Sequence, residues 1–356
     1  MREHAVRERA QAAWLPSPVV RRTVAGIGRT LITLGLLILL FVGYQLWGTD
    51  VFTARAQSKL RHQLQRLTQA VDATTSTTGT TATTSKNSTP TTTGPPAALQ
   101  LPPINPGDPL GKLIIPKAGV NWVFVQGTER DDLAKGPGHY PSTPFPGQVG
   151  NAAIAGHRTT HGAPFYNIDA LQPRTKDHRG DYIVTQTLIG DHAFEVIDVR
   201  TVKPSDTWVA GPMTLPEQQL QHTGLKLDAK KAYLTLTSCN PRYSARERIV
   251  ILAELINPNH KPKNAPKSSG AVSAVNFKGQ SKTETAKALS EGLSGDVSSR
   301  IPALLWGFIA LAIGGVWWWS FRRYRHPLTW LAGVVPFLAV LFVFYVYLER
   351  MLPANY

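Results

Sequence analysis

The most apolar parts of the chain are three uncharged runs, at residues 31–47, 301–321 and 328–348. They contain 17, 21 and 21 residues, and a helix needs about 20 apolar residues to cross a bilayer. A buried core helix seldom continues that far without a charge. The pattern therefore predicts transmembrane helices at 30–48, 301–321 and 328–348. Pro336 is compatible with the third helix, because neighbouring groups in a membrane bundle can satisfy the freed backbone.

Basic residues beside these runs predict the orientation of the chain. Six arginines lie in the tail 1–29, and three more lie in the short loop 322–327. Short flanks rich in Arg and Lys stay in the cytoplasm. We therefore expect both segments to be cytoplasmic, and the long middle segment and the tail 349–356 to be extracytoplasmic. The small-x-small triplet 54–56 leaves open a cleaved signal peptide, but an uncleaved anchor is favoured because the apolar run is long and ends well before it.

Two polar segments separate the first and second apolar runs from the middle of the chain. Residues 49–97 are rich in Thr and Pro, with twelve threonines in residues 74–93. Such a composition buries too little apolar surface to offset the entropy of ordering, and predicts a disordered stalk. Residues 257–300 are again polar and rich in Lys, Ser, Ala and Gly, and this composition predicts a linker. The segment between them, 98–256, is then a folded domain held by two flexible tethers.

The domain has the pattern of short strands separated by Gly and Pro. Residues 233–239 alternate with a period of two, which is typical of a half-buried strand. The other predicted strands are 112–115, 122–125, 151–156, 181–187, 193–203 and 248–255. Helical signals are confined to 130–135, 164–171 and 216–221. Seven or eight short strands predict an all-β barrel or sandwich, with short helices.

Net charge does not indicate nucleic-acid binding. The chain has 38 Lys and Arg against 23 Asp and Glu, a formal charge of +15. Within 98–256, however, 16 basic residues face 15 acidic ones. The excess therefore lies in the tails, tethers and loop, where it sets topology. A nucleic-acid partner is not expected, because the net charge of the domain is close to zero and it has no finger or stacking motif.

The single cysteine, Cys239, excludes a disulfide framework. It ends a predicted strand, directly before Asn240 and Pro241, where a loop can form a site. A buried structural thiol is the alternative. Two residues favour chemistry: Arg248 opens the next strand, and His157 ends another. A thiol, an imidazole and a guanidinium at neighbouring strand ends can perform acyl transfer, with the arginine stabilising the oxyanion.

The same residues resemble the signature motifs of the sortase family, the cell-surface transpeptidases of Gram-positive bacteria. Residues 235–239 (TLTSC), followed by Arg248, are similar to the cysteine motif of that family. Residues 136–140 (GPGHY) and 155–158 (AGHR) are similar to its histidine region. The resemblance covers about residues 108–256.

This resemblance implies a fold, a site and partners. The fold is a closed eight-stranded sortase-type β-barrel. Cys239 is the nucleophile, His157 the acid/base and Arg248 the oxyanion-stabilising residue, with no cofactor and no metal. The implied reaction cleaves the Thr–Gly bond of a C-terminal LAxTG/LPxTG-like sorting signal and transfers a surface protein to a peptidoglycan-precursor amine. The implied location is the cell membrane, with several spans and an extracytoplasmic domain.

Residues 156–165 make the chain most similar to class E sortases, although Ser238 replaces the usual Thr and a C-terminal helical hairpin is unusual in that class. A pilin-polymerising class C enzyme is an alternative, but the chain has Leu110 where that lid carries an aromatic residue after Asp-Pro. An L,D-transpeptidase would place its cysteine in a different motif. A catalytically silent scaffold on a sortase-like barrel is the remaining alternative.

Two groups of residues have spacings that could suit a metal ion. The H-x-x-x-H spacing of His157 and His161 lacks both a glutamate base and a helix, so His161 is interpreted as a rim residue. Asp131 and Asp132 could bind calcium, but a solvated loop is the better interpretation.

Overall fold

The computed structural model describes residues 18–78, 104–206, 224, 227–228, 230–258, 265–271, 296–324 and 327–352. The predictions for the tail 1–17, the Thr-rich residues 79–97, the helix 216–221 and most of the linker 257–300 lie outside these residues. The chain divides into two units, Met1–Gly48 and Thr49–Tyr356, and each is described by itself.

The first unit contains helix α2 (Pro18–Gly43), followed by a π-helical turn at Tyr44–Gly48. Within the residues that the structure describes, three stretches are long and apolar enough to cross a membrane: Val19–Gly43, Val297–Tyr324 and Ala332–Met351. They confirm the three predicted helices.

The second and third of these stretches form helices α7 (Arg300–Tyr324) and α8 (Pro327–Met351) in the second unit. These two helices pack together, with the ring of Trp317 5.6 Å from that of Phe337.

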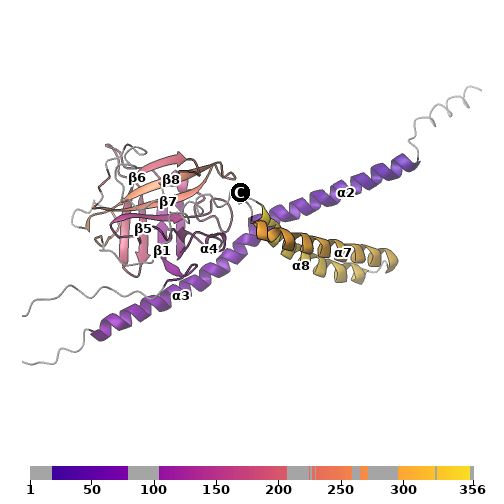
Figure 1. Cartoon of the computed structure of the whole chain (residues 1–356), viewed down its shortest axis with the longest axis horizontal. Coiled ribbons are helices and arrows are strands. Elements are labelled where there is room, and N and C mark those ends of the chain that lie inside the picture. The colour runs from indigo at the N-terminus through magenta and orange to yellow at the C-terminus, as the bar shows by residue number, and fades with distance from the viewer. Residues whose placement is uncertain are drawn as a thin grey trace, which may run out of the picture. The chain divides into compact units, whose positions relative to one another are not determined.

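Eight strands close into a barrel in the order β1-β2-β3-β4-β7-β8-β6-β5, with β5 pairing back to β1 (Figure 1). This confirms the predicted fold. Only β3 was missed from the sequence, because two residues carry no periodicity. The strands are β1 (Pro109–Ile115), β2 (Val120–Gln126), β3 (Gly138–His139), β4 (Gly150–Ala155), β5 (Tyr182–Thr187), β6 (Gly190–Val202), β7 (Ala232–Asn240) and β8 (Glu247–Leu255).

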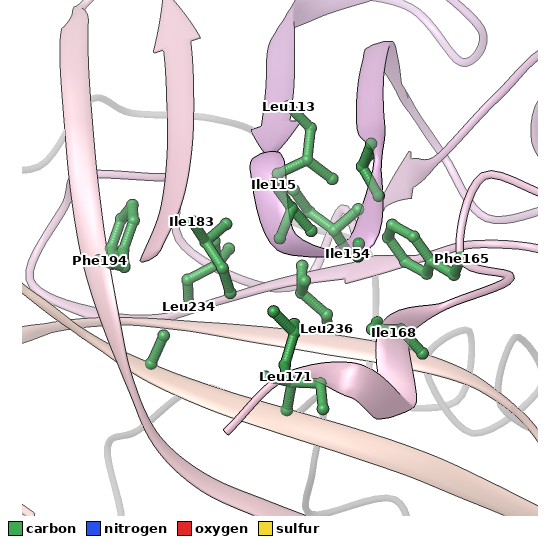
Figure 2. Packing of buried hydrophobic residues seen from close by; sticks show 14 of the residues in the cluster. Leu113, Ile115, Ile154, Phe165, Ile168, Leu171, Ile183, Phe194, Leu234 and Leu236 are labelled. Carbon is green, nitrogen blue, oxygen red and sulfur yellow. The ribbon is translucent and has the colours of Figure 1, made fainter. Parts of the chain in front are cut away.

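The barrel interior is filled by aliphatic and aromatic side chains from the inward positions of the strands. Figure 2 shows Leu234 and Leu236 of β7 facing Ile154 of β4 and Ile183 of β5. Phe165 enters this core from the loop after β4, and is fully buried. That loop is therefore anchored to the barrel by its far end.

Strand β7 is more deeply buried than its period-two pattern predicted. Every residue from Ala232 to Ser238 is buried, because apolar clusters also cover the outer face. Tyr233 packs with Leu252 on that face. The hydroxyl of Thr235 donates to Asn151 Oδ1 at 2.7 Å, and Thr237 is bonded to Tyr140 at 3.1 Å. The outward threonines thus satisfy their hydroxyls inside the protein instead of in water.

The disordered stalk predicted for residues 49–97 is wrong for its first part. Helix α3 (Thr49–Thr78) occupies this part. Residues 49–70 contain no Gly or Pro, and the Thr-rich composition begins only at 74. Thr53, Gln57 and Leu60 share one face of α3 and are buried, since a spacing of three or four places them one above another. This face lies on the barrel, where Leu60 contacts Val123 and Val125 of β2.

Candidate active site

Cys239 and Arg248 lie directly opposite each other on neighbouring strands. The antiparallel register of β7 and β8 pairs Cys239 with Arg248. The thiol is free and half-buried, whereas the arginine is 6% exposed. Arg248 Nη1 donates to the carbonyl oxygens of Ala245 (3.0 Å) and Glu247 (3.1 Å). These bonds hold the guanidinium beside the strand end that carries the thiol.

His157 reaches the same end of the barrel through parallel pairing. Strands β4 and β7 run side by side, with Ala155 opposite Thr237. Gly156 N extends this ladder to Thr237 O at 3.1 Å. Continuing the register by two residues places His157 level with Cys239. The three predicted site residues are therefore brought together by two strand pairings.

The residues beside the histidine and the cysteine lock the two strand ends together. Ser238 Oγ donates to Gly156 O at 2.7 Å, and Ser238 is buried. A Cβ on Gly156 would lie 2.6 Å from the ring of Phe165, so a larger residue there would displace the loop that follows. The hydroxyl that the sequence retains at Ser238 thus has a structural role.

Burial controls the charge of the imidazole. Desolvation holds the pKa of His157 well below its usual range, and the nearby side chains of His161 and Arg130 lower it further. Among the residues that the structure describes, Nε2 of His157 has no hydrogen-bond partner and is buried. His157 is therefore neutral at pH 7 and has a ring nitrogen free to take a proton.

Part of the chain is similar to known proteins. Residues 113–256 match the family model described as "Sortase domain". The matched segment is a sortase domain. Two curated relatives are Sortase SrtE1 and Sortase SrtE2 of Streptomyces coelicolor, which are 30% identical over 248 residues and 28% identical over 258 residues. Their names agree with the predicted similarity to class E.

The alignments cover 67% and 68% of this chain, and 59% of Sortase SrtE1 and 85% of Sortase SrtE2. The chain thus spans little more than half of Sortase SrtE1. Among solved structures, the Sortase E1 of Streptomyces coelicolor with a tripeptide in its active site is 26% identical, with a TM-score of 0.36. That match covers 44% of this chain and 96% of the solved one.

Sequence reasoning missed the part played by Arg158 in the sortase domain. Its side chain is 2% exposed and connects the histidine loop to the cysteine strand. Nη1 donates to Cys239 O at 3.1 Å, Nε donates to Tyr166 O at 3.0 Å, and Nη2 pairs with Asp169 at 2.9 Å. A basic residue after the histidine was the available signal, but sequence alone does not show that it is buried.

The interpretation of Asp132 as part of a solvated loop is wrong. It lies in the short helix α4 (Arg130–Leu133), is buried, and pairs with Lys135 at 3.2 Å. Burial raises the pKa of its carboxyl group. Within the described part of the sortase chain, no three His, Cys, Asp or Glu side chains are grouped as metal ligands would be.

Proposed function

We propose that this chain is a membrane-anchored cysteine transpeptidase that sorts surface proteins to the cell wall. It cleaves the Thr–Gly bond of a C-terminal LAxTG/LPxTG-like signal and joins the new carboxyl end to a cell-wall peptide amine. The observation that carries this proposal is the convergence of Cys239, Arg248 and His157 at one end of the barrel through the registers of β7 with β8 and with β4.

The first half of the reaction uses the neutral imidazole. His157 takes the thiol proton of Cys239, and Sγ attacks the threonine carbonyl carbon. The carbonyl oxygen becomes an oxyanion, which the guanidinium of Arg248 stabilises. The C–N bond then breaks as the imidazolium gives its proton to the departing glycine amine. A thioacyl enzyme and a short peptide result.

The second half reverses these roles. The accepting amine attacks the thioacyl carbon and loses a proton to the neutral His157. The C–S bond breaks, the new amide leaves, and the proton returns to Cys239. Arg158 supports both halves by fixing the carbonyl of Cys239, which keeps the thiol aligned with the histidine loop.

We further propose the topology that the basic flanks predict, with the tail before α2 and the α7–α8 loop in the cytoplasm. The barrel then lies on the outer side, where surface proteins and cell-wall precursors are found. Labelling of single introduced cysteines in a Cys239→Ala chain by an impermeant reagent tests this. Labelling at position 117 but not at position 2 in intact cells is expected, and the reverse result would overturn the topology.

The enzymatic test uses the full chain in detergent with an LAxTG peptide and an amine. Mass spectrometry should show a thioacyl adduct in the wild type and none in Cys239→Ala. With His157→Gln, which cannot protonate the leaving amine efficiently, the adduct should form at least about 100-fold more slowly. If iodoacetamide alkylates Cys239 while no peptide adduct ever forms, the chain is a scaffold and the proposal fails.

A further inference from the structure

The C-terminal end of α8 contacts the sortase barrel beside the histidine loop. Arg130 of α4 donates from Nη1 to Arg350 O and from Nη2 to Glu349 O, both at 2.7 Å. The side chain of Arg350 in turn pairs with Asp131 at 3.1 Å. These bonds add a side-chain donor to two carbonyls of the last turn, where Glu349 O also accepts from Leu352 N and Arg350 O from Asp296 N. The hairpin is thereby fixed against the barrel by its last turn.

The same turn presents Glu349 to His161. Glu349 Oε1 lies 3.4 Å from His161 Nε2, and the two side chains are 14% and 12% exposed. The ring of His161 lies 4.9 Å from the ring of His157. His161 has φ of 53°, a left-handed conformation that costs a non-glycine residue energy. The loop therefore holds this imidazole between the carboxylate and the acid/base at some energetic cost.

We propose that Glu349 is a positioning residue for the transpeptidase reaction: it acts through His161 to orient His157 and to balance the positive charge that His157 acquires. The helical hairpin thus completes the active site in addition to anchoring the chain. This inference rests on the proposed function, in which His157 becomes an imidazolium once Cys239 has lost its proton.

The charges around His157 explain why a carboxylate matters there. His161 and Arg130 both lower the pKa of His157, and both oppose the imidazolium that the reaction needs. The carboxylate of Glu349, one imidazole ring away from His157, opposes this effect with its negative charge. The other titratable and charged groups of the adjoining segments include Arg158 of the same loop, Arg350 of α8, Asp131 and Asp132 of α4, Asp296 before α7, Asp50 of α3, Cys239 of β7 and Arg248 of β8.

Removing the negative charge should therefore make the imidazolium, and with it the thiolate, harder to form. For a unit charge in a partly buried site one ring away, the effect is on the order of tenfold, equivalent to a shift of about one pH unit. Uncharged steps, such as substrate binding, should change little. The expected signature is a lower kcat with an unchanged KM.

The experiment measures the pH dependence of Cys239 alkylation by iodoacetamide, in the full chain in detergent, alongside kcat and KM for the peptide. In Glu349→Gln, alkylation near pH 7 should be about tenfold slower and its profile should move about one unit to higher pH. Glu349→Asp should restore part of the rate. The matched control is Glu254→Gln, which removes a carboxylate of β8 far from the site. Glu254 lies opposite Tyr233 in the strand register, and Tyr233 is six residues along β7 from Cys239.

Two further variants separate charge from docking. Arg350→Gln removes the pair with Asp131 but keeps the carboxylate, and should leave the alkylation profile in place. In a His161→Asn background, adding Glu349→Gln should change nothing further, since the connection is already broken. A Glu349→Gln profile that overlays the wild type, or an equal shift in Arg350→Gln, would overturn the proposal. Alkylation needs no transpeptidation, so this result is independent of whether the peptide reacts.

Discussion

The side chain of Gln57 takes the place of a missing strand at the edge of β2. On one side, β2 pairs with β1 along its length. On the other side, β3 pairs only with Val125 and Gln126 of β2, so Val123 has no strand partner there. The amide of Gln57 fills this gap, accepting from Val123 N at 2.9 Å and donating to Val123 O at 2.8 Å. A third bond, to Lys135 O at 2.8 Å, ties the loop before β3 to α3. Gln57 is 2% exposed.

Replacing Gln57 with Ala should therefore destabilise the edge considerably. Three hydrogen bonds are lost at about 1 kcal/mol each, and buried backbone groups are left without partners. We expect the free energy of local opening to fall by about 3 kcal/mol, which corresponds to roughly a 100-fold loss of protection from hydrogen exchange. The measurement is native-state exchange of the peptide that contains Val123, in the full chain in detergent.

The matched control lies on the same helix. Gln65 is exposed, so Gln65→Ala should change exchange of the β2 peptide by less than about 0.5 kcal/mol. If Gln57→Ala exchanges like the wild type, or if the two variants behave alike, then α3 does not complete the barrel edge and its docking contributes nothing to stability.

Three further changes test other parts of the structure. Arg158→Lys should slow thioacyl formation on the order of tenfold or more, because the fork that holds the Cys239 carbonyl is lost. The same change at the half-buried Arg242 should slow it by less than about threefold in the same peptide assay. Burial lowers the pKa of His139 to about 4 from 6.5. Between pH 7 and pH 5 the unfolded chain therefore takes up a proton on this residue that the folded chain does not bind. Denaturant unfolding should show that this group lowers the free energy of unfolding by about 2 kcal/mol over that range. His139→Asn should remove that slope. Ser238→Ala should lower the free energy of unfolding by about 1–2 kcal/mol, because the carbonyl of Gly156 loses its hydrogen bond from Ser238 Oγ. A Ser238→Ala chain as stable as the wild type would show that this bond does not contribute to stability.

Local signals in the sequence were enough for the barrel and for placing the three candidate site residues at strand ends. Long uncharged runs predicted the apolar helices, and the ends of predicted strands placed Cys239 and Arg248. The remaining features depend on pairings between distant segments. That His161 would lie against Glu349, 188 residues away, has no local pattern. The buried face of α3 does have a local pattern, the spacing of Thr53, Gln57 and Leu60. The Thr-rich residues that follow made the whole segment resemble a disordered stalk, so the helix was not predicted.

Two residues that lie next to apolar segments in the sequence contact the loop that carries His157. Asp50, two residues after the first apolar unit, accepts from Gly162 N at 2.7 Å. Glu349, at the end of the last apolar helix, contacts His161 in the same loop. Both contacts hold the loop that carries His157, so under the proposed topology this end of the barrel is kept at the outer membrane surface. A sorting signal whose protein is still in the membrane would then meet Cys239 close to the membrane surface, without a large movement of the barrel.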